Sequence, residues 1–290
     1  MKWFILLAAG LTIPVLNAAA QQPDTTRLVV HYKFLHLRDT TNRNNPYRDN
    51  MVLLVGKHAS AYRSYDHQTQ QDLAKQTKQA PAITAGRPSG LVYYQFFHGK
   101  KLTRKEPILF SNFLISEALP AISWHINPDT ASFGGLHCQK ADCHFKGRDY
   151  IAWFCPDLPV PAGPWKLNGL PGVIVEACDT KKEVCFMFDG IERIESPFIA
   201  GDEPPGGRPP MNGGPLFHED NHLIIKIPDN ATPTTEKELA RLYELGRKDP
   251  KALVVALVGP QDPGTPGPKI DIKAAPLPVE NNPIELPEKQ

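Results

Sequence analysis

The chain has 290 residues, of which 32 are lysine or arginine and 31 are aspartate or glutamate. Because a nearly neutral chain offers no large basic surface, the composition argues against nucleic acid or an anionic membrane as the partner. Proline accounts for 30 residues, yet 41% of the chain is hydrophobic. This combination indicates a folded core with proline-rich loops rather than global disorder.

The first twenty residues are typical of a secretory signal peptide. Lys2 provides a positive charge, residues 3–16 form an apolar run, and three alanines ending at Ala20 provide the small side chains of a cleavage site. We therefore expect an exported protein, periplasmic or secreted, whose signal peptide is cleaved near Ala20. No later apolar run reaches the roughly 18 residues that a membrane-spanning helix needs, so the sequence predicts no membrane span.

The sequence after the signal peptide predicts short strands, because runs rich in β-branched and aromatic residues alternate with polar turns. In chain order the predicted strands are Leu28–Leu37, Met51–Val55, Ala59–Tyr65, Leu91–Phe97, Ile108–Leu114, Ile122–Ile126, the two arms of a hairpin within Phe133–Cys155 that turns at residues 146–149, Val173–Cys178, Val184–Ile191, His222–Ile227 and Leu253–Val258. Two helices are expected. Gln70–Gln79 contains good helix formers with a polar surface, and Glu236–Gly246 is amphipathic and capped by Thr234-Thr235.

These elements predict a mainly β fold: a curved antiparallel sheet or half-barrel with about two helices and a proline-rich C-terminal tail. We expect a signal peptide at 1–20, a single antiparallel β domain at 21–258 and a proline-rich segment at 259–290. Within that last segment, Ile270–Ile272 and Pro283–Leu286 offer further pairing at the sheet edge.

The residues Gly169-Leu170-Pro171-Gly172, followed by Val173-Ile174, form a distinctive six-residue motif. It resembles the signature of the GLPGLI family of exported bacterial proteins of unknown function, with Val173 in place of the second leucine of that signature. The resemblance continues in the family's order through YKFLHLRDTTNRNN, MVLLVGKHASAYRSY, SEALPAISWHI, GGLHCQKA, FKGRDYIAWF, PAGPWKLNGLPGVI, DGIERI and NNPIEL. It implies an envelope or secreted, predominantly β protein and supplies no catalytic residues.

The segment His218-Glu219-Asp220-Asn221-His222 matches the H-E-x-x-H pattern of zinc peptidases, in which a helix places both histidines on one face. A proline- and glycine-rich stretch precedes it and a strand-like run follows it. In an extended segment His218 and His222 would lie about 13 Å apart, too far to share one zinc ion. We therefore expect a solvated loop that enters a strand, with a zinc site as the alternative.

A second metal candidate combines His137, Cys138, Cys143 and His144, since two sulfurs and two imidazoles suit Zn or Cu. Cys138 and Cys143 are an odd number of residues apart and so face opposite sides of a single strand. A shared metal would need a bulge or a tight turn, and we favour structural cysteines. A two-residue turn after Lys146 would place Cys138 beside Cys155, whereas a wider loop would bring Cys143 toward Cys155.

The chain has five cysteines, so in an exported protein at least one is unpaired or bonded to another molecule. Cys178 and Cys185 are placed symmetrically about Lys181-Lys182, which would set them directly across two antiparallel strands. Because such a pair lies close to disulfide range, we predict a Cys178–Cys185 disulfide.

The signature segment also predicts a tight turn and a candidate recognition residue. Leu170-Pro171-Gly172-Val173 has proline and glycine at the second and third positions of a type II turn, where the third residue needs a positive φ. Trp165 lies nearby, outside any obvious strand, and tryptophan is favoured in binding hot spots. Two interpretations stay open: the turn only reverses the chain, or the turn and Trp165 form a recognition edge.

The sequence contains neither a G-x-S-x-G nucleophile motif nor a C-x-x-C redox motif. We therefore predict a non-enzymatic envelope protein, without a cofactor, that binds a partner protein, a peptide or a small apolar ligand such as a lipid. A curved sheet that encloses an apolar cavity would suit an apolar ligand. The alternative is an envelope protein that binds Zn or Cu through its Cys and His residues, with a zinc peptidase as the third hypothesis.

Overall fold

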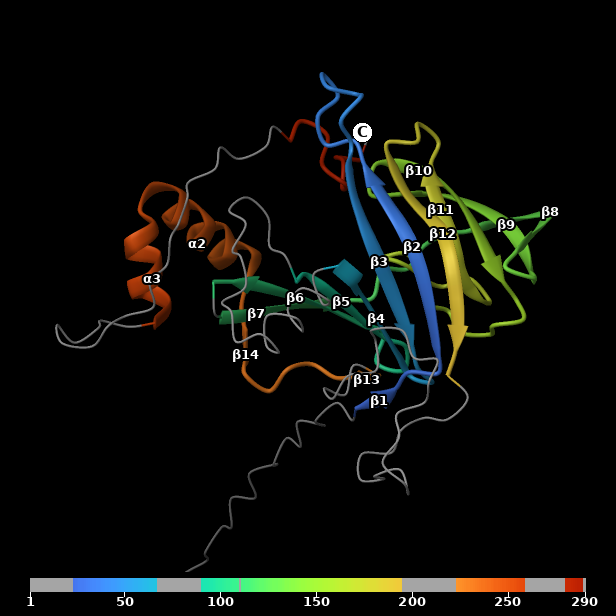
Figure 1. The fold of residues 1–290 in the computed structure, drawn as a ribbon, viewed down its shortest axis with the longest axis horizontal. Coiled ribbons are helices and arrows are strands. Elements are labelled where there is room, and N and C mark those ends of the chain that lie inside the picture. Colours follow the sequence, from blue (N-terminus) through green and yellow to red (C-terminus); the bar gives the residue numbers. More distant parts are fainter. Residues whose placement is uncertain (1–22, 67–89, 110, 195–222, 259–279, 289–290) are drawn as a thin grey trace, which may run out of the picture.

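The computed structural model describes residues 23–66, 90–109, 111–194, 223–258 and 280–288 (Figure 1). The predicted signal peptide, the predicted helix Gln70–Gln79 and both histidines of the His218–His222 segment lie outside the described residues. None of the helices in the described part of the chain combines the length and the apolar character that a membrane crossing requires.

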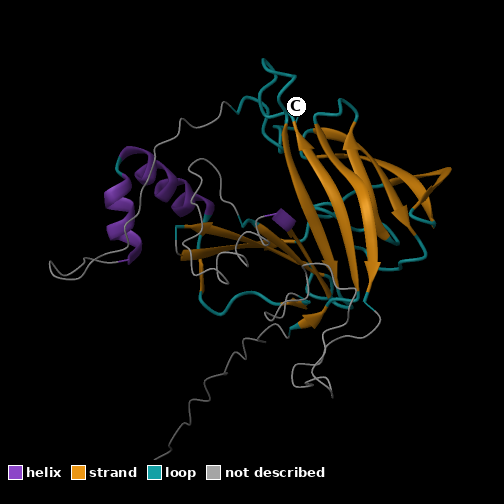
Figure 2. Ribbon diagram, viewed as in Figure 1, coloured by secondary structure: helices purple, strands orange, loops and turns teal. Residues whose placement is uncertain are grey.

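Most of the described chain forms one large, predominantly antiparallel sheet, which confirms the prediction of a mainly β fold with two helices (Figure 2). Its twelve strands follow the order β14-β7-β6-β5-β4-β3-β2-β12-β11-β10-β9-β8. Their bounds are β2 (Leu28–His36), β3 (Tyr47–Val55), β4 (Ala59–Ser64), β5 (Val92–Phe96), β6 (Lys101–Ile108), β7 (Ser111–Ala118), β8 (His125–Phe133), β9 (Leu136–Phe145), β10 (Arg148–Cys155), β11 (Val173–Asp179), β12 (Val184–Arg193) and β14 (Ala231–Pro233). β1 (Asp24–Thr25) and β13 (Ile224–Ile225) form a separate antiparallel pair. β14 and β8 are the two edges, so the sheet is open rather than closed into a barrel.

Two predicted strands are displaced in the structure. The expected strand Ile108–Leu114 spans the connection between β6 and β7, where Leu109 has a φ of 54°. β6 has the sequence KLTRKEPI. Because its charged residues are not typical of a strand, which is usually rich in β-branched and aromatic residues, this strand was not predicted. The expected strand Ile122–Ile126 overlaps β8 only from His125 onward.

The predicted strand Leu253–Val258 is wrong, because this segment belongs to helix α3 (Pro250–Val258). A short apolar run does not by itself distinguish a strand from a packed helix. The deciding residue is Asp249, whose Oδ1 accepts hydrogen bonds from two backbone N–H groups of the first turn at 3.1 and 3.0 Å. The other helix, α2 (Glu236–Lys248), starts where the sequence predicts and has Thr235 as its N-cap.

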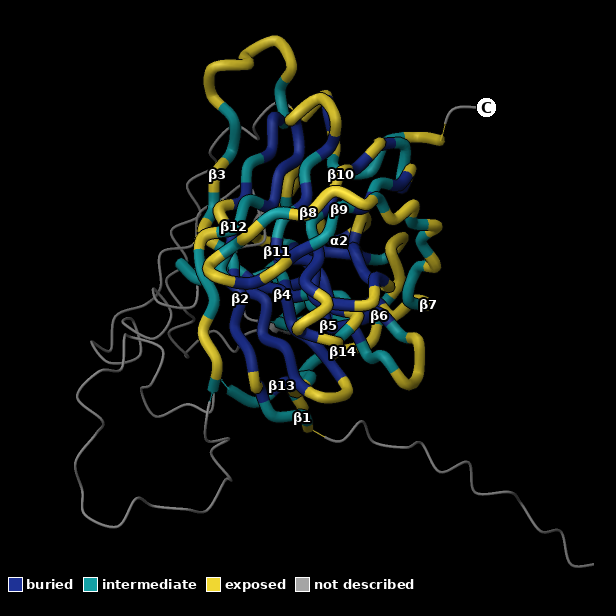
Figure 3. The backbone as a smooth tube through the Cα atoms, turned by 90° about the vertical axis from the view of Figure 1, so that its right-hand side faces the viewer, coloured by how far each residue is buried: buried dark blue, intermediate teal, exposed yellow. Residues whose placement is uncertain are grey.

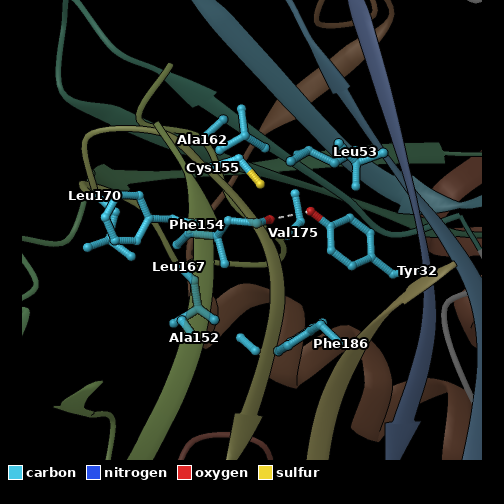
Figure 4. Packing of buried hydrophobic residues seen from close by; sticks show 14 of the residues in the cluster. Tyr32, Leu53, Ala152, Phe154, Cys155, Ala162, Leu167, Leu170, Val175 and Phe186 are labelled. Carbon is cyan, nitrogen blue, oxygen red and sulfur yellow. Dashed lines mark hydrogen bonds between the residues drawn. The ribbon is translucent and has the colours of Figure 1, made fainter. Parts of the chain in front are cut away.

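The loop 156–172, which connects β10 to β11, fills the curve of the sheet. Its residues Leu167 and Leu170 belong to the main hydrophobic cluster, together with residues of β2, β3 and β9–β12, and Figure 4 shows both beside Phe154 of β10. Gln95 of β5 holds the loop from the other side, since its Nε2 lies 3.1–3.2 Å from three backbone oxygens of the loop. Buried backbone lies in the middle of the sheet, and exposed backbone lies at the hairpin ends (Figure 3).

Candidate binding site at the rim of the sheet

The rim of the sheet, formed by the turns of the β2–β3, β9–β10 and β11–β12 hairpins, is covered by residues 280–288, the C-terminal segment (Figure 1). At the start of the segment, the backbone N–H groups of residues 281 and 282 donate to the carbonyl oxygen of Arg38 at 3.1 and 3.0 Å. Near its end, the N–H of Leu286 donates to the carbonyl oxygen of Lys146 at 3.0 Å. The segment forms no strand, so its backbone is held by separate hydrogen bonds to these turns and to side chains of the neighbouring strands.

Arg148, the first residue of β10, is the centre of the rim. Its side chain is only 2% exposed, and its Nη1 donates to the Asp179 carboxylate at 2.6 Å. The other donors reach the C-terminal segment: Nη2 lies 2.7 Å from the side-chain oxygen of Asn282 and 2.7 Å from the carbonyl oxygen of Pro283, and Nε lies 3.0 Å from the carbonyl oxygen of Ile284. One buried cation therefore binds three consecutive residues of the segment.

Asn282 is the most enclosed residue of the segment, with 5% exposure. Its Nδ2 donates to the carbonyl oxygen of Leu37 at 2.7 Å and to the Glu183 carboxylate at 3.1 Å, while its Oδ1 accepts from Arg148. Its backbone oxygen lies 2.8 Å from Nε2 of His36. Both ends of the side-chain amide are thus used, each by a group of the opposite hydrogen-bonding kind.

Glu285 of the segment forms ion pairs with two lysines of the fold. Its carboxylate lies 2.8 Å from Nζ of Lys166 and 3.2 Å from Nζ of Lys146. Burial opposes ionisation of this carboxyl, yet hydrogen bonds from Lys166 and then Lys146 lower the pKa of Glu285 below its ordinary value. Burial alone would lower the pKa of Lys166, but hydrogen bonds to Glu117 and Glu285 raise it. Both groups are therefore charged at neutral pH.

His144 ties the end of the segment to the β9–β10 hairpin. Its Nδ1 lies 2.6 Å from the Asp149 carboxylate, and its Nε2 lies 2.9 Å from the carboxylate of Glu288, which also accepts from the N–H of Gly147 at 3.1 Å. Hydrogen bonds to Asp149 and then to Glu288 raise the pKa of His144. With both ring nitrogens donating to carboxylates, the imidazolium form is favoured, and this form offers no lone pair to a metal ion.

Neither Arg148 nor the charged groups that surround it are recognisable as a site in the sequence. Arg148, Asp179 and Glu183 look like ordinary surface residues in a sequence, because charged side chains are seldom buried. The available signals were the resemblance of the NNPIEL string at 281–286 to a family and the prediction that Pro283–Leu286 pairs at the sheet edge. Burial of these polar groups becomes evident once the three hairpins are brought together.

The two best-defined hollows in the described part of the chain are open depressions near the rim. One, of about 540 Å³, lies beside Asp142, His144 and Ile151, and the other, of about 450 Å³, lies beside Arg38 and Tyr47. Neither is an enclosed apolar pocket of the kind that holds a lipid. The curve of the sheet, where such a pocket was conceivable, is occupied by the loop 156–172.

The structure does not bring the predicted metal candidates together. The sulfur of Cys138 is bonded to Cys155. Along the same strand β9, His137 is exposed and Cys143 is buried. Burial, with a smaller effect of nearby carboxylates, raises the pKa of the Cys143 thiol to about 12. Within the described residues, no group of three or more His, Cys, Asp or Glu side chains is placed to hold a metal ion. His218 and His222 lie outside this part of the chain.

The structure contains two disulfides, and each links the two strands of one hairpin. Cys178 and Cys185 are directly paired in the β11–β12 register, with their Cα atoms 4.1 Å apart. In the other hairpin the turn consists of Lys146-Gly147, so continuing the register sets Cys138 opposite Cys155, again with a Cα separation of 4.1 Å. Of the two pairings that the sequence left open, the structure has Cys138–Cys155.

The predicted type II turn at residues 170–173 is wrong in its geometry. Gly172 does not have a positive φ; the left-handed glycine of the signature is Gly169, with a φ of 91°. Gly172 is needed for a different reason, because a Cβ atom on it would stand 2.6 Å from the carbonyl carbon of Cys155. Its lack of a side chain lets the signature segment pass close to the end of β10.

The recognition hypothesis for Trp165 is also wrong. Its side chain is 2% exposed and lies in the main hydrophobic cluster, where its ring stacks on Phe186 at 6.5 Å and meets Phe145 edge-on at 5.8 Å. Trp165 adopts a φ of 55°, a left-handed conformation that non-glycine residues rarely take. This kink turns the ring into the core, which a sequence search for strands cannot foresee.

The family model described as "Protein of unknown function (Porph_ging)" matches residues 139–176, which run from β9 into β11. No curated protein is similar enough to count as a match. Two solved structures of PNGF-II, in the C2 and P21 space groups, are 10% and 11% identical to the chain, with TM-scores of 0.49 and 0.48. They match 77% and 74% of this chain but only 33% and 32% of their own, so this chain spans about a third of their length. Membership of the GLPGLI family stays a prediction.

Proposed function

We propose that this protein is an exported, non-enzymatic binding protein, and that the rim binds a peptide segment of its partner. The observation that carries the proposal is that the rim already holds one such segment, residues 280–288. The side chain of Arg148 donates to the backbone oxygens of Pro283 and Ile284. At the start of the segment, the carbonyl oxygen of Arg38 accepts from the backbone N–H groups of residues 281 and 282. Main-chain contacts combined with one buried side chain are typical of peptide recognition.

Export is supported by two kinds of observation. The N-terminal sequence has the pattern of a signal peptide. The two disulfides suit an oxidising compartment such as the periplasm or the medium, since disulfides are rare in the cytosol.

A peptide or protein partner is favoured over a lipid, because the loop 156–172 fills the inner curve of the sheet with Leu167 and Leu170. The chemistry of the cysteines and of His144 points away from the metal-binding alternative. Two disulfides use four of the five cysteines, the fifth has a raised thiol pKa, and both ring nitrogens of His144 face carboxylates.

The test uses the complete protein with a specific protease site inserted within residues 259–279 and a fluorophore at the C-terminus. After cleavage the labelled tail has no covalent link to the rest of the chain, and the contacts of residues 280–288 with the rim should keep it bound. We expect an unlabelled peptide of residues 280–290 to displace it in a saturable manner, seen as a fall in fluorescence anisotropy, while a scrambled peptide of equal composition does not. The near-UV circular dichroism of the cut protein reports whether its tertiary structure persists.

The proposal fails if the cut protein keeps its near-UV spectrum but no concentration of peptide exchanges with the tail. A measurement on the uncut chain covers the case in which cleavage disturbs the fold. There the attached tail competes at an effective concentration in the millimolar range. A millimolar excess of peptide should then accelerate hydrogen exchange of the Leu286 amide, and an unchanged rate would contradict peptide binding.

A further inference from the structure

Among the described residues of the C-terminal segment, Asn282 is the buried one whose side-chain amide is hydrogen-bonded at both ends. Nδ2 faces two acceptors, the Leu37 carbonyl and the Glu183 carboxylate, and Oδ1 faces a donor, Arg148. An aspartate would place a carboxylate oxygen against both acceptors, and a longer glutamine would not fit the same three partners. A site built to hydrogen-bond both ends of an amide rejects residues that leave its buried groups unpaired.

Pro283 follows with its ring exposed and its carbonyl oxygen bound by Arg148. Proline has no N–H to satisfy and a φ that is fixed near −65°, so it lowers the entropy lost when the segment is ordered. The next side chain, that of Ile284, packs against the main hydrophobic cluster. The carboxylate of Glu285 then lies between Lys166 and Lys146.

We infer that the rim recognises a specific class of peptide: a bent segment, neither helix nor strand, with asparagine and proline in succession, then an aliphatic residue, then a carboxylate. Asn282 is the specificity-determining position in the copy of this sequence that the chain itself carries. This inference rests on the proposed function and names the chemistry of the partner.

The test is a competition between peptides on the cut, complete protein with its labelled tail. The peptides span residues 280–290 and carry Asn282→Asp, Asn282→Gln or Glu285→Gln. The matched control is Gln290→Glu, which makes the same change of an amide to a carboxylate at the last residue of the peptide. Asn281 is not a suitable control, because its Nδ2 donates to Asp39 at 3.1 Å. We expect Asn282→Asp to weaken competition on the order of 100-fold, and Asn282→Gln to weaken it by a factor of ten or more. Glu285→Gln should cost about 3- to 10-fold, less at high salt, and the control should stay within about 3-fold.

The outcomes separate the inference from the proposed function. If the native peptide competes and the Asn282→Asp peptide competes equally well, the rim binds peptides without reading this residue, and the inference is overturned while the proposed function stands. If the Gln290→Glu control loses as much as Asn282→Asp, the effect is one of peptide charge and the inference is again wrong. If no peptide competes at all, the C-terminal segment is only a structural part of the fold, and both proposals fall.

Discussion

Replacing Arg148 with methionine tests whether one buried cation holds the rim together. The substitution leaves Asp179 and Glu183, both buried, without the cation they share. Removing one partner of a buried ion pair typically costs about 3–5 kcal/mol. Because Asp179 still accepts from the backbone N–H groups of Glu183 and Val184, we expect the lower end of this range, about 3 kcal/mol.

Urea unfolding of the disulfide-intact protein measures this loss, and amide hydrogen exchange shows where it acts. The N–H of Leu286, bonded to the carbonyl of Lys146 in the native protein, should exchange faster in Arg148→Met because the segment is released more often. The matched control is Lys140→Met on the adjacent strand β9. Lys140 pairs with the exposed Asp129 at 2.9 Å, and such surface pairs contribute at most about 1 kcal/mol.

A double-mutant cycle isolates the ion pair itself. Asp179→Asn combined with Arg148→Met should cost less than the two single substitutions together, with a coupling of at least about 1 kcal/mol. If Arg148→Met cost no more than the surface control and left Leu286 equally protected, the reasoning that places this cation at the centre of the rim would be refuted.

Three further predictions follow from the core and from the end of the segment. Gly172→Ala should destabilise the protein by about 2 kcal/mol or more, since the new Cβ would overlap the Cys155 carbonyl; calorimetry that shows an unchanged melting temperature would contradict the close approach. Trp165→Ala truncates a buried side chain and should lower the free energy of unfolding by about 3–5 kcal/mol. If the variant lost peptide binding while its stability stayed unchanged, Trp165 would have a recognition role after all. The pKa of His144, followed by NMR, should lie above its ordinary value of 6.5 and fall in Glu288→Gln. Because folding raises the pKa of His144, the contact between His144 and Glu288 stabilises the fold fully below pH 6.5. This stabilisation is lost as the pH rises through the folded-state pKa, so the amides of the segment should then exchange faster.

The sequence predicted those parts of the fold whose signal is local. β2, β10 and β11 alternate buried residues with less buried ones over part of their length, and the α2 cap is a local contact between Thr235 and Glu238. Where two structures share one local pattern, the prediction failed. The apolar run of α3 reads equally well as a strand, and only the capping bonds of Asp249 decide between the two.

The rim could not be predicted, because its contacts join distant parts of the chain. Asn282 lies 134 residues from Arg148 and 246 residues from His36 along the sequence. No periodicity encodes such a pairing, and a buried arginine has the same sequence appearance as an exposed one. The error at Trp165 has the same origin, since its burial depends on Phe145 and Phe186 from two other strands.

The two disulfides restrain hairpins whose turns contribute to the rim. Cys178–Cys185 and Cys138–Cys155 each staple one hairpin whose turn contributes to the rim, with sequence separations of 7 and 17 residues. In the chain-entropy model, such short loops contribute about 2.5 and 3 kcal/mol. The Cys178–Cys185 disulfide lies beside the β11–β12 turn and so restrains Glu183, whereas Cys138–Cys155 joins β9 and β10 at the end of their hairpin opposite to the Lys146-Gly147 turn. If the proposed peptide site exists, the restraint on Glu183 lowers the entropy that this part of the rim loses on binding.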